Sequence, residues 1–278
     1  MTQTQFIMLG CGTPNCTPGR SQQSSAVIVD GRAYLIDCGA GTLYRAAEAY
    51  GRGVPGFDLK DLTHIFLTHL HPDHSTGLAA MIIAPWVRDR TVPLNVYGPA
   101  GTQAMVDHLL AAYQIGIYEH ANGPSPLNDE GLVVVHEYDA GLIYEDERVT
   151  VSAFRVKHSF LDAFGLKFVT PDKTIVHSGD TCFVPEMIEQ ARGCDILIHE
   201  VYSHEALQQR DPGWKHYHST VHTSSLDVAR IALEAKPGLV ILNHYMSWGI
   251  VPDEAILAEI RTIYDGPVVL GKDLEIYE

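Results

Sequence analysis

The segment THLHPDHSTG, residues 68–77, holds the densest group of side chains able to bind metal ions. Four of them lie within six residues: His69, His71, Asp73 and His74. Pro72 prevents a regular helix from running through all four. Such a turn can direct one pair of imidazoles at one metal ion and the Asp–His pair at a second. A lone HxH is a weak signal, whereas HxHxDH after a buried strand and before a helix predicts a metal site.

Side chains of the same chemistry follow apolar runs elsewhere in the chain. The runs IFLT, FRVK, TIVHSG, ILI and VILN are followed by His69, His158, Asp180, the pair His199–Glu200, and His244. Because ligands gather at the carboxyl ends of strands in open α/β sheets, we expect these side chains to converge on one site. Taken singly, His158 or His244 would more often be a hydrogen-bonded core residue. The HxHxDH segment in the same chain favours a ligand role.

The elements that must position these side chains are short apolar runs bounded by Gly, Pro or Asp, such as FIML, AYLID, LNVYG and VVLG. Helical patterns lie between some of them, at 75–84, 101–114, 223–236 and 253–264. Since strands and helices interleave, the fold class is α/β. The turn-rich stretch 119–130 predicts a seam between two halves of a single domain, 1–278.

The charge balance restricts the partners that we expect. Nineteen Lys plus Arg stand against 34 Asp plus Glu, which gives a net charge of −15. This charge repels a polyphosphate over a long range, so nucleic acid is a disfavoured partner. No stretch approaches the roughly 18 apolar residues of a membrane span, and the segment MTQTQFIMLGCG lacks the features of a secretory signal. We therefore expect a soluble, cytoplasmic protein that does not bind a membrane.

The order of these motifs resembles that of the metallo-β-lactamase superfamily, and of its ribonuclease Z-like members in particular. The resemblance rests on the opening LGCGTPNCTPGRSQQSSAVIVDGRAYLIDCGAGT, HxHxDH, His158-Ser159, Ser178-Gly179-Asp180-Thr181 and Asn243-His244. It implies a four-layer αβ/βα fold in which two β-sheets are sandwiched between helices. It also implies a homodimer.

The resemblance assigns the ligands to two ions. His69, His71 and His158 would hold the first ion, Asp73, His74 and His244 the second, and Asp180 would bridge both. Zinc accepts imidazole and carboxylate ligands of this kind, and manganese or iron are alternatives. Two such ions share a hydroxide and clamp the oxygens of an ester, with Asp73 counted among the catalytic residues.

A proton donor is expected downstream of the ligands. ILIHEVY at 196–202 and HTSSLDVARIA at 222–232 resemble two further ribonuclease Z boxes, of which the second supplies a catalytic histidine. Either His222 or His218 fits that role, and His222 is favoured because it lies just before a predicted helix. Glu200 would hydrogen-bond to His222 and keep it protonated. The amides and hydroxyls of Thr223 and Ser224 would face an anionic ester, and Trp248, with Trp214 and Tyr217, could line a pocket for the leaving group.

Several functions compete within the superfamily. Ribonuclease Z usually carries a long Gly/Pro-rich arm between the boxes that contain His158 and Asp180, and here only FLDAFGLKFVTPDKTIVH fills 160–177. Together with the net charge, this favours a dinuclear zinc hydrolase of small anionic esters, either aryl sulfates or phosphodiesters, similar to the arylsulfatase-like branch. The alternatives are a ribonuclease Z-type endonuclease that processes tRNA 3′ ends, a lactonase, and a non-catalytic protein of the same fold.

Overall fold

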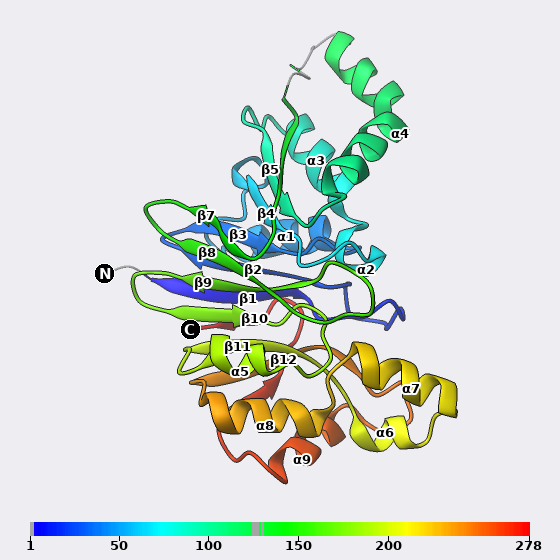
Figure 1. Ribbon diagram of the computed structural model, residues 1–278. Coiled ribbons are helices and arrows are strands. Elements are labelled where there is room, and N and C mark those ends of the chain that lie inside the picture. Colours follow the sequence, from blue (N-terminus) through cyan, green and yellow to red (C-terminus); the bar gives the residue numbers. More distant parts are fainter. Residues whose placement is uncertain (1–2, 124–127, 129–130) are drawn as a thin grey trace.

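Two β-sheets pack face to face and helices cover their outer faces (Figure 1). In the computed structural model, which describes residues 3–123, 128 and 131–278, each sheet has seven strands. The predicted four-layer αβ/βα arrangement is therefore confirmed.

The first sheet contains the strand that precedes the HxHxDH segment. Its order is β14 (Ile276–Tyr277), β1 (Thr4–Gly10), β2 (Ser24–Val29), β3 (Arg32–Ile36), β4 (His64–Phe66), β5 (Leu94–Gly98) and β6 (Val133–Glu137). The strands from β14 to β3 pair antiparallel, and those from β3 to β6 pair parallel.

The second sheet positions the three remaining predicted ligands, His158, Asp180 and His244. Its order is β13 (Val268–Leu270), β12 (Leu239–Met246), β11 (Ile196–Tyr202), β10 (Thr174–His177), β9 (Phe164–Val169), β8 (Thr150–Arg155) and β7 (Gly141–Glu145). β10 to β13 are parallel, while β8 and β10 are both antiparallel to β9. The carboxyl ends of β8, β10, β11 and β12 therefore lie at the same edge of the sheet.

The helices form the two outer layers. Those that precede β6 are α1 (Thr42–Gly51), the short 3₁₀ helix η1 (Leu59–Asp61), α2 (Pro72–Ser75), α3 (Leu78–Val87) and α4 (Thr102–Asn122). Those that follow β10 are α5 (Pro185–Ala191), α6 (His204–Gln208), α7 (Pro212–Val221), α8 (Ser225–Ala235) and α9 (Glu254–Arg261). Figure 1 shows α8 and α9 below the second sheet and α4 projecting at the opposite end of the molecule. None of the described helices combines the length and apolar character that crossing a bilayer requires.

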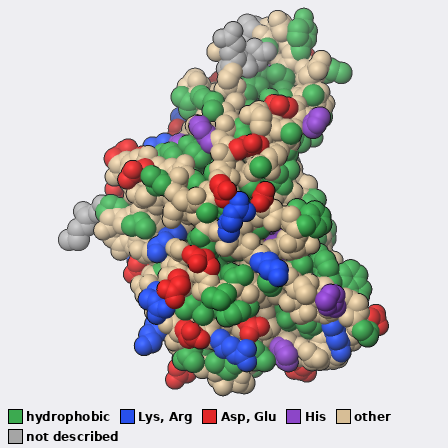
Figure 2. Space-filling model, in the orientation of Figure 1, with side chains coloured by type: hydrophobic (Ala, Val, Ile, Leu, Met, Phe, Trp, Pro, Cys, Tyr) green, Lys and Arg blue, Asp and Glu red, His purple; other side chains and the backbone are tan. Residues whose placement is uncertain are grey.

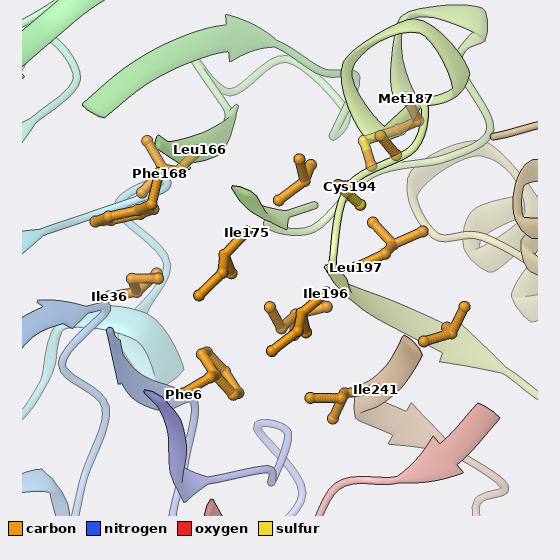
Figure 3. Close-up of a cluster of buried hydrophobic side chains, with 14 of the residues drawn as sticks. Phe6, Ile36, Leu166, Phe168, Ile175, Met187, Cys194, Ile196, Leu197 and Ile241 are labelled. Carbon is orange, nitrogen blue, oxygen red and sulfur yellow. The ribbon is translucent and has the colours of Figure 1, made fainter. Parts of the chain in front are cut away.

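The core follows from the period-two alternation of the strands. In β1, Phe6 and Met8 face the cluster between the two sheets, while Ile7 and Leu9 face the cluster under the helices of the first sheet. Figure 3 shows Phe6 of β1 in the same cluster as Ile175 of β10 and other side chains of the second sheet. The two sheets thus share one buried apolar layer, which fixes the strand ends relative to one another.

Several elements differ from the prediction. The helix predicted over 101–114 continues to Asn122, so residues 119–122 of the predicted seam are helical. The rest of that seam lies partly outside the described residues, and the chain passes from the first sheet to the second between β6 and β7, at 138–140. The helix predicted over 75–84 is present as α3 but lies three residues later, at Leu78–Val87, and the separate short helix α2 precedes it.

Candidate metal centre

The HxHxDH segment leaves β4 and turns directly into α2. His69 is fully buried, and its Nδ1 lies 3.0 Å from the hydroxyl oxygen of Thr68, which orients the ring. The helix begins only at Pro72, preceded by His71 in an extended conformation, as the proline predicts. This short helix places Asp73 and the ring of the fully buried His74 on the inner side of the turn.

Asp180 follows β10 through a tight turn. Gly179 has a φ of 59°, a left-handed conformation that favours glycine. A Cβ at this position would lie only 2.6 Å from the carbonyl oxygen of Phe164. Glycine is therefore required for both conformation and space, and it sets the direction in which Asp180 points.

The carboxylate of Asp180 lies at the centre of the site. Its two oxygens are 3.4–3.9 Å from the Nε2 atoms of four imidazoles: His74, His244, His69 and His158. A carboxylate with imidazoles around both of its oxygens has the geometry of a bridging ligand.

A β-bulge directs His244 into the site. The register between β11 and β12 shifts at this point, so that His244 is an additional residue without a partner across the ladder. Its φ is 43°, which is uncommon for a residue other than glycine, and its amide donates to the carbonyl oxygen of Cys11 at 3.1 Å. The ring is thereby turned toward Asp73, whose Oδ2 lies 3.0 Å from His244 Nε2.

His158 joins the site from the loop after β8. Its Nδ1 donates to the carbonyl oxygen of Val221 at 2.7 Å, which leaves Nε2 available as a ligand. This Nε2 lies 3.1 Å from Nδ1 of His71. The loop after β8 and the HxHxDH segment therefore meet at one point.

All seven predicted metal ligands come together. Among the described residues, potential ligand atoms lie within 4.8 Å of one another in three groups: His69, His71, His158 and Asp180; Asp73, His74 and His244; and Asp180, His222 and His244. The first two groups correspond to the two ion sites that the resemblance implies.

The chemistry of these donors fits metal ions. Nε2 of His69 and Nε2 of His74 are buried and have no hydrogen-bond partner. A buried polar atom without a partner is costly unless a ligand satisfies it. These atoms face the carboxylate of Asp180 at 3.9 and 3.4 Å, which is the imidazole and carboxylate mixture that divalent zinc accepts.

The titration of the site shows the same need for cations. Burial lowers the pKa of His74, but the carboxylates of Asp180, Asp37 and Asp73 raise it well above the usual value. Burial would raise the pKa of Asp180, yet the imidazoles of His244 and His74 lower it well below its usual range. The carboxylates thus favour positive charge at their centre, which protons provide in the absence of metal.

Asp37 is a residue of this site that the sequence analysis does not single out. It follows β3 and accepts hydrogen bonds from the Thr68 amide at 2.8 Å and from Nδ1 of His74 at 2.7 Å. Asp37 therefore fixes the tautomer of His74 and leaves its Nε2 for a metal ion. The signal in the sequence is the same as for the ligands, since the run AYLI ends in this aspartate.

His222 and Glu200 form a buried pair beside the ligands. His222 lies between α7 and α8, and its Nδ1 is 3.0 Å from Oε1 of Glu200 in β11. The same oxygen accepts the amides of Thr181 and Thr223. The hydrogen bond expected between His222 and Glu200 is therefore present.

The expected protonation of His222 is not supported. Burial lowers the pKa of His222 to about 4, in spite of the opposing charge of Asp180. Burial and the charge of Asp180 raise the pKa of Glu200 well above its usual value. At neutral pH the imidazole is therefore neutral, because the water-excluded position disfavours the charged form.

His218 lies one step farther from the ligands. Its ring stacks on His222 at a centroid distance of 5.7 Å and lies 4.7 Å from that of Trp248. Its Nδ1 is buried without a hydrogen-bond partner, and no carboxylate orients it among the described residues. The geometry therefore favours His222 over His218 for proton transfer.

The hydroxyls of Thr223 and Ser224 are engaged within the protein. Thr223 Oγ1 donates to the carbonyl oxygen of Thr181, and Ser224 caps α8 by accepting the amide of Asp227. The helix cap is thus confirmed, whereas a contact of these hydroxyls with substrate remains a prediction. Trp248 lines a cavity that adjoins His218, as described below.

Comparison with known proteins agrees with this arrangement. Residues 32–245 match the family described as the β-lactamase superfamily domain. The ribonuclease Z of Mycobacterium marinum is 32% identical over 289 residues, covering 99% of this chain and 98% of that protein. The chain belongs to the metallo-β-lactamase superfamily. Within it, the relatives found include proteins called ribonuclease Z.

Solved structures share the metallo-β-lactamase fold over the whole chain. The short form of human tRNase Z superposes with a TM-score of 0.71 at 22% identity, covering 99% of this chain and 98% of that one. Zn²⁺-bound PqqB from Methylobacterium extorquens superposes with a TM-score of 0.73 at 14% identity, covering 99% of both chains. At these identities the likeness concerns the fold alone. The chain is a metallo-β-lactamase-fold hydrolase with a His/Asp site suited to two metal ions.

Proposed function

We propose that the chain is a metal-dependent phosphodiesterase of the ribonuclease Z type, which cleaves RNA at the 3′ end of precursor tRNA. The observation that carries the proposal is the match to ribonuclease Z from one end of the chain to the other, together with a complete ligand set and the His222–Glu200 pair. This function is the alternative to the small-ester hydrolase that the sequence analysis favours.

The short connection between His158 and Asp180 does not oppose this function. The alignment with the M. marinum ribonuclease Z spans 289 residues and covers 98% of that protein, and this chain has 278 residues. The difference leaves no room for a long arm that the relative has and this chain lacks. A protein called ribonuclease Z therefore has nearly the same length.

The metal ions would be held as the ligand groups suggest. His69, His71 and His158 surround one position, Asp73, His74 and His244 surround the other, and Asp180 faces both. When bound, a pair of divalent ions supplies a nucleophile at neutral pH and stabilises charge on the oxygens of a phosphodiester.

His222 would move the proton of the reaction. Its Nδ1 is fixed by Glu200, so its other ring nitrogen is left to face Asp180 and His244. Because the ring is neutral at pH 7, it can accept a proton released by the attacking water and then deliver it to the leaving oxygen. Glu200 keeps the ring in one tautomer and one orientation, and it acts as a positioning residue.

The proposal is tested by comparing substrates on the metal-loaded protein. A precursor tRNA with a 3′ trailer, a bis-aryl phosphodiester, an aryl sulfate and a lactone are assayed side by side. Low and physiological salt are both needed, because phosphate contacts make binding of RNA strongly dependent on salt. Asp180→Asn serves as the inactive control.

We expect a single endonucleolytic cut at the 3′ end of the tRNA, at a rate above that for every small ester. A protein that turns over small esters but leaves precursor tRNA intact at low salt overturns the proposal. The small-ester hydrolase, favoured by the net charge of −15, would then replace it. Figure 2 shows acidic and basic side chains interspersed over the face drawn there, rather than segregated.

The remaining expectations stay predictions. They are that zinc is the metal, that the protein is a homodimer and that it is cytoplasmic. Metal analysis bears on the non-catalytic alternative, because a relative that has lost catalysis should not retain two ions per chain.

A further inference from the structure

A cavity lies next to the candidate metal centre. Its volume is about 760 Å³, and its walls include Asn15 and Arg20 of the loop after β1, Trp214 of α7, and residues 245–249, which follow His244 directly. The same loop after β1 supplies the carbonyl oxygen that accepts the His244 amide. The cavity and the metal centre therefore share two of their walls.

Arg210 is the distinctive residue of this cavity. Its guanidinium lies over two indole rings, at 4.8 Å from the Trp248 centroid and 5.2 Å from the Trp214 centroid. Its Nε is buried without a hydrogen-bond partner, and it makes no ion pair with any residue that the structure describes. Two cation–π contacts thus hold the group in place without neutralising its charge.

The second arginine of the cavity differs in this respect. Arg20 forms an ion pair with Asp253 at 2.5 Å and lies over the ring of Tyr245. Its charge is largely offset by that carboxylate. Arg210 therefore carries the positive charge that this cavity can offer to an anion, in a chain whose net charge is −15.

A series of rings connects Arg210 with the ligands. His218 lies 4.7 Å from Trp248, stacks on Trp214 at 5.6 Å, and stacks on His222 at 5.7 Å. His222 in turn stacks on the ligand His244 at 5.6 Å. A substrate whose scissile bond lies at the metal centre would extend along this aromatic wall.

We propose that the cavity binds the nucleotide next to the scissile phosphate, with its base on the aromatic wall and its own phosphate on Arg210. The proposal rests on the proposed function, since it assumes a nucleic acid substrate. Aromatic side chains stack on any base. A fixed guanidinium offers paired N–H donors that match the oxygens of a phosphate, which a flexible lysine does not.

The test measures binding to the metal-loaded protein by calorimetry, with adenosine, adenosine 5′-monophosphate and adenosine 3′,5′-bisphosphate as probes. One phosphate can occupy the metal centre, and the second reports on Arg210. In the unmodified protein the second phosphate should strengthen binding roughly 10- to 100-fold, the range of a charge-assisted hydrogen bond. Arg210→Gln should abolish this gain.

Two further variants separate charge from geometry. Arg230→Gln removes an exposed arginine of α8 that pairs with Asp227, and it should leave the gain unchanged. Arg210→Lys keeps the charge without the planar fork and should keep only part of the gain. A melting temperature for each variant establishes that it is folded. Trp214→Ala should weaken adenosine binding while sparing inorganic phosphate.

The outcomes distinguish the two proposals. Equal gains from the second phosphate in Arg210→Gln and the unmodified protein overturn the role of Arg210. Equal affinities for inorganic phosphate and adenosine 5′-monophosphate overturn the base-stacking wall. If both features hold but precursor tRNA is not cut, the proposed function fails while the nucleotide site stands.

Discussion

The carboxylate of Asp37 controls a metal ligand without lying among the ligand groups. Its oxygen is 2.7 Å from His74 Nδ1, so Asp37→Asn would weaken the hydrogen bond that fixes this imidazole. We expect metal affinity to fall roughly 10- to 100-fold, the usual effect of losing such a partner. Competition with a chelator measures the affinity. Asp265→Asn, an exposed change of the same chemistry, should leave it unaltered, and an equal loss there would contradict this role for Asp37.

Asp180 should decide whether one or two ions are retained. Seven ligands are too many for one tetrahedral ion, and a shared carboxylate can join two. We expect elemental analysis to find two divalent ions per chain. Asp180→Asn should lower this number, because an amide neutralises neither ion. One ion at saturating metal in the unmodified protein would exclude the dinuclear site.

The neutral imidazole of His222 predicts an effect that depends on the leaving group. His222→Ala should keep both metal ions, since the seven predicted ligands do not include it and stay intact. Turnover of esters with poor leaving groups should slow by roughly 10²–10⁴-fold, the scale of general acid catalysis. Esters with good leaving groups need no proton and should be affected far less. Equal losses on both classes would direct attention to His218.

At the scale of residues, the sequence predicts the metal ligands better than the residues that hydrogen-bond to them. The HxHxDH spacing and the strand ends identify seven of the eight side chains in the three ligand groups. The eighth is His222, which the sequence analysis assigns to proton transfer instead. The role of Asp37 is not predicted, because a single aspartate after a strand is also common in turns. The protonation state of His222 is predicted wrongly, because its pKa depends on burial, which only the folded chain defines.

At the scale of elements, the turn after β10 is sensitive to a single carbon atom. Gly179→Ala places a Cβ 2.6 Å from the carbonyl oxygen of Phe164, at a φ of 59°. Gly193 offers a matched control, since its φ is 64° and nothing lies within 4 Å of an added Cβ. Both changes carry the conformational cost of about 1–3 kcal/mol. Gly179→Ala should add a steric cost and displace Asp180.

The comparison requires two measurements on each variant. Urea unfolding gives the stability, and elemental analysis gives the metal content. We expect Gly179→Ala to be the less stable variant and to lose metal, while Gly193→Ala keeps both ions. Identical stability and metal content would show that the turn can relax without moving the carboxylate.

Physical reasons explain why the sequence analysis does not predict some of the helices and strands. β7 is an edge strand with mostly exposed side chains, so GLIYE lacks a clear alternation. β9 contains Gly165, which packs against the ring of Phe154. A glycine within an apolar run favours the prediction of a turn over a strand. α4 continues to Asn122 beyond its buried residues, and the bulge at His244 depends on pairing between two strands.

At the scale of the whole molecule, buried neutral histidines make the fold sensitive to acid. Burial lowers the pKa of His64 to about 4, and the same holds for His177 and His199. In the unfolded chain these rings titrate near 6.5. Between pH 6.5 and 4 the unfolded state therefore binds more protons. Stability is full above this window and is lost as the pH falls through it.

His64→Gln isolates one contribution, because His64 lies away from the metal ligands and next to Arg32. Each such histidine steepens the dependence of unfolding free energy on pH by up to about 1.4 kcal/mol per unit. Urea unfolding at several pH values between 4 and 7.5 should thus give a shallower slope for the variant. Parallel curves would mean that His64 has the same pKa in the folded and the unfolded protein.

The overall charge and composition of the chain predict the substrate less well than they predict any other property. A net charge of −15 describes an average over the surface, whereas Arg210 is a local cation that forms no ion pair with the part of the chain that the structure describes. Fold class and metal chemistry are readable from periodicity and spacing. The choice between RNA and a small ester depends on which side chains line one cavity, and spacing along the chain does not reveal that.

The pairing of β1 with β14 has a consequence for how the protein is made. Phe6 lies opposite Tyr277, and the Asp273 carboxylate accepts the amides of Cys11 and Ser21. During translation one edge of β1 must wait for β14, which follows tens of seconds later at about 5–20 residues per second. Until then that edge is open to pairing with other nascent chains. Ribosome stalling between His244 and β14 should therefore expose an aggregation-prone edge, even with every predicted metal ligand already synthesised.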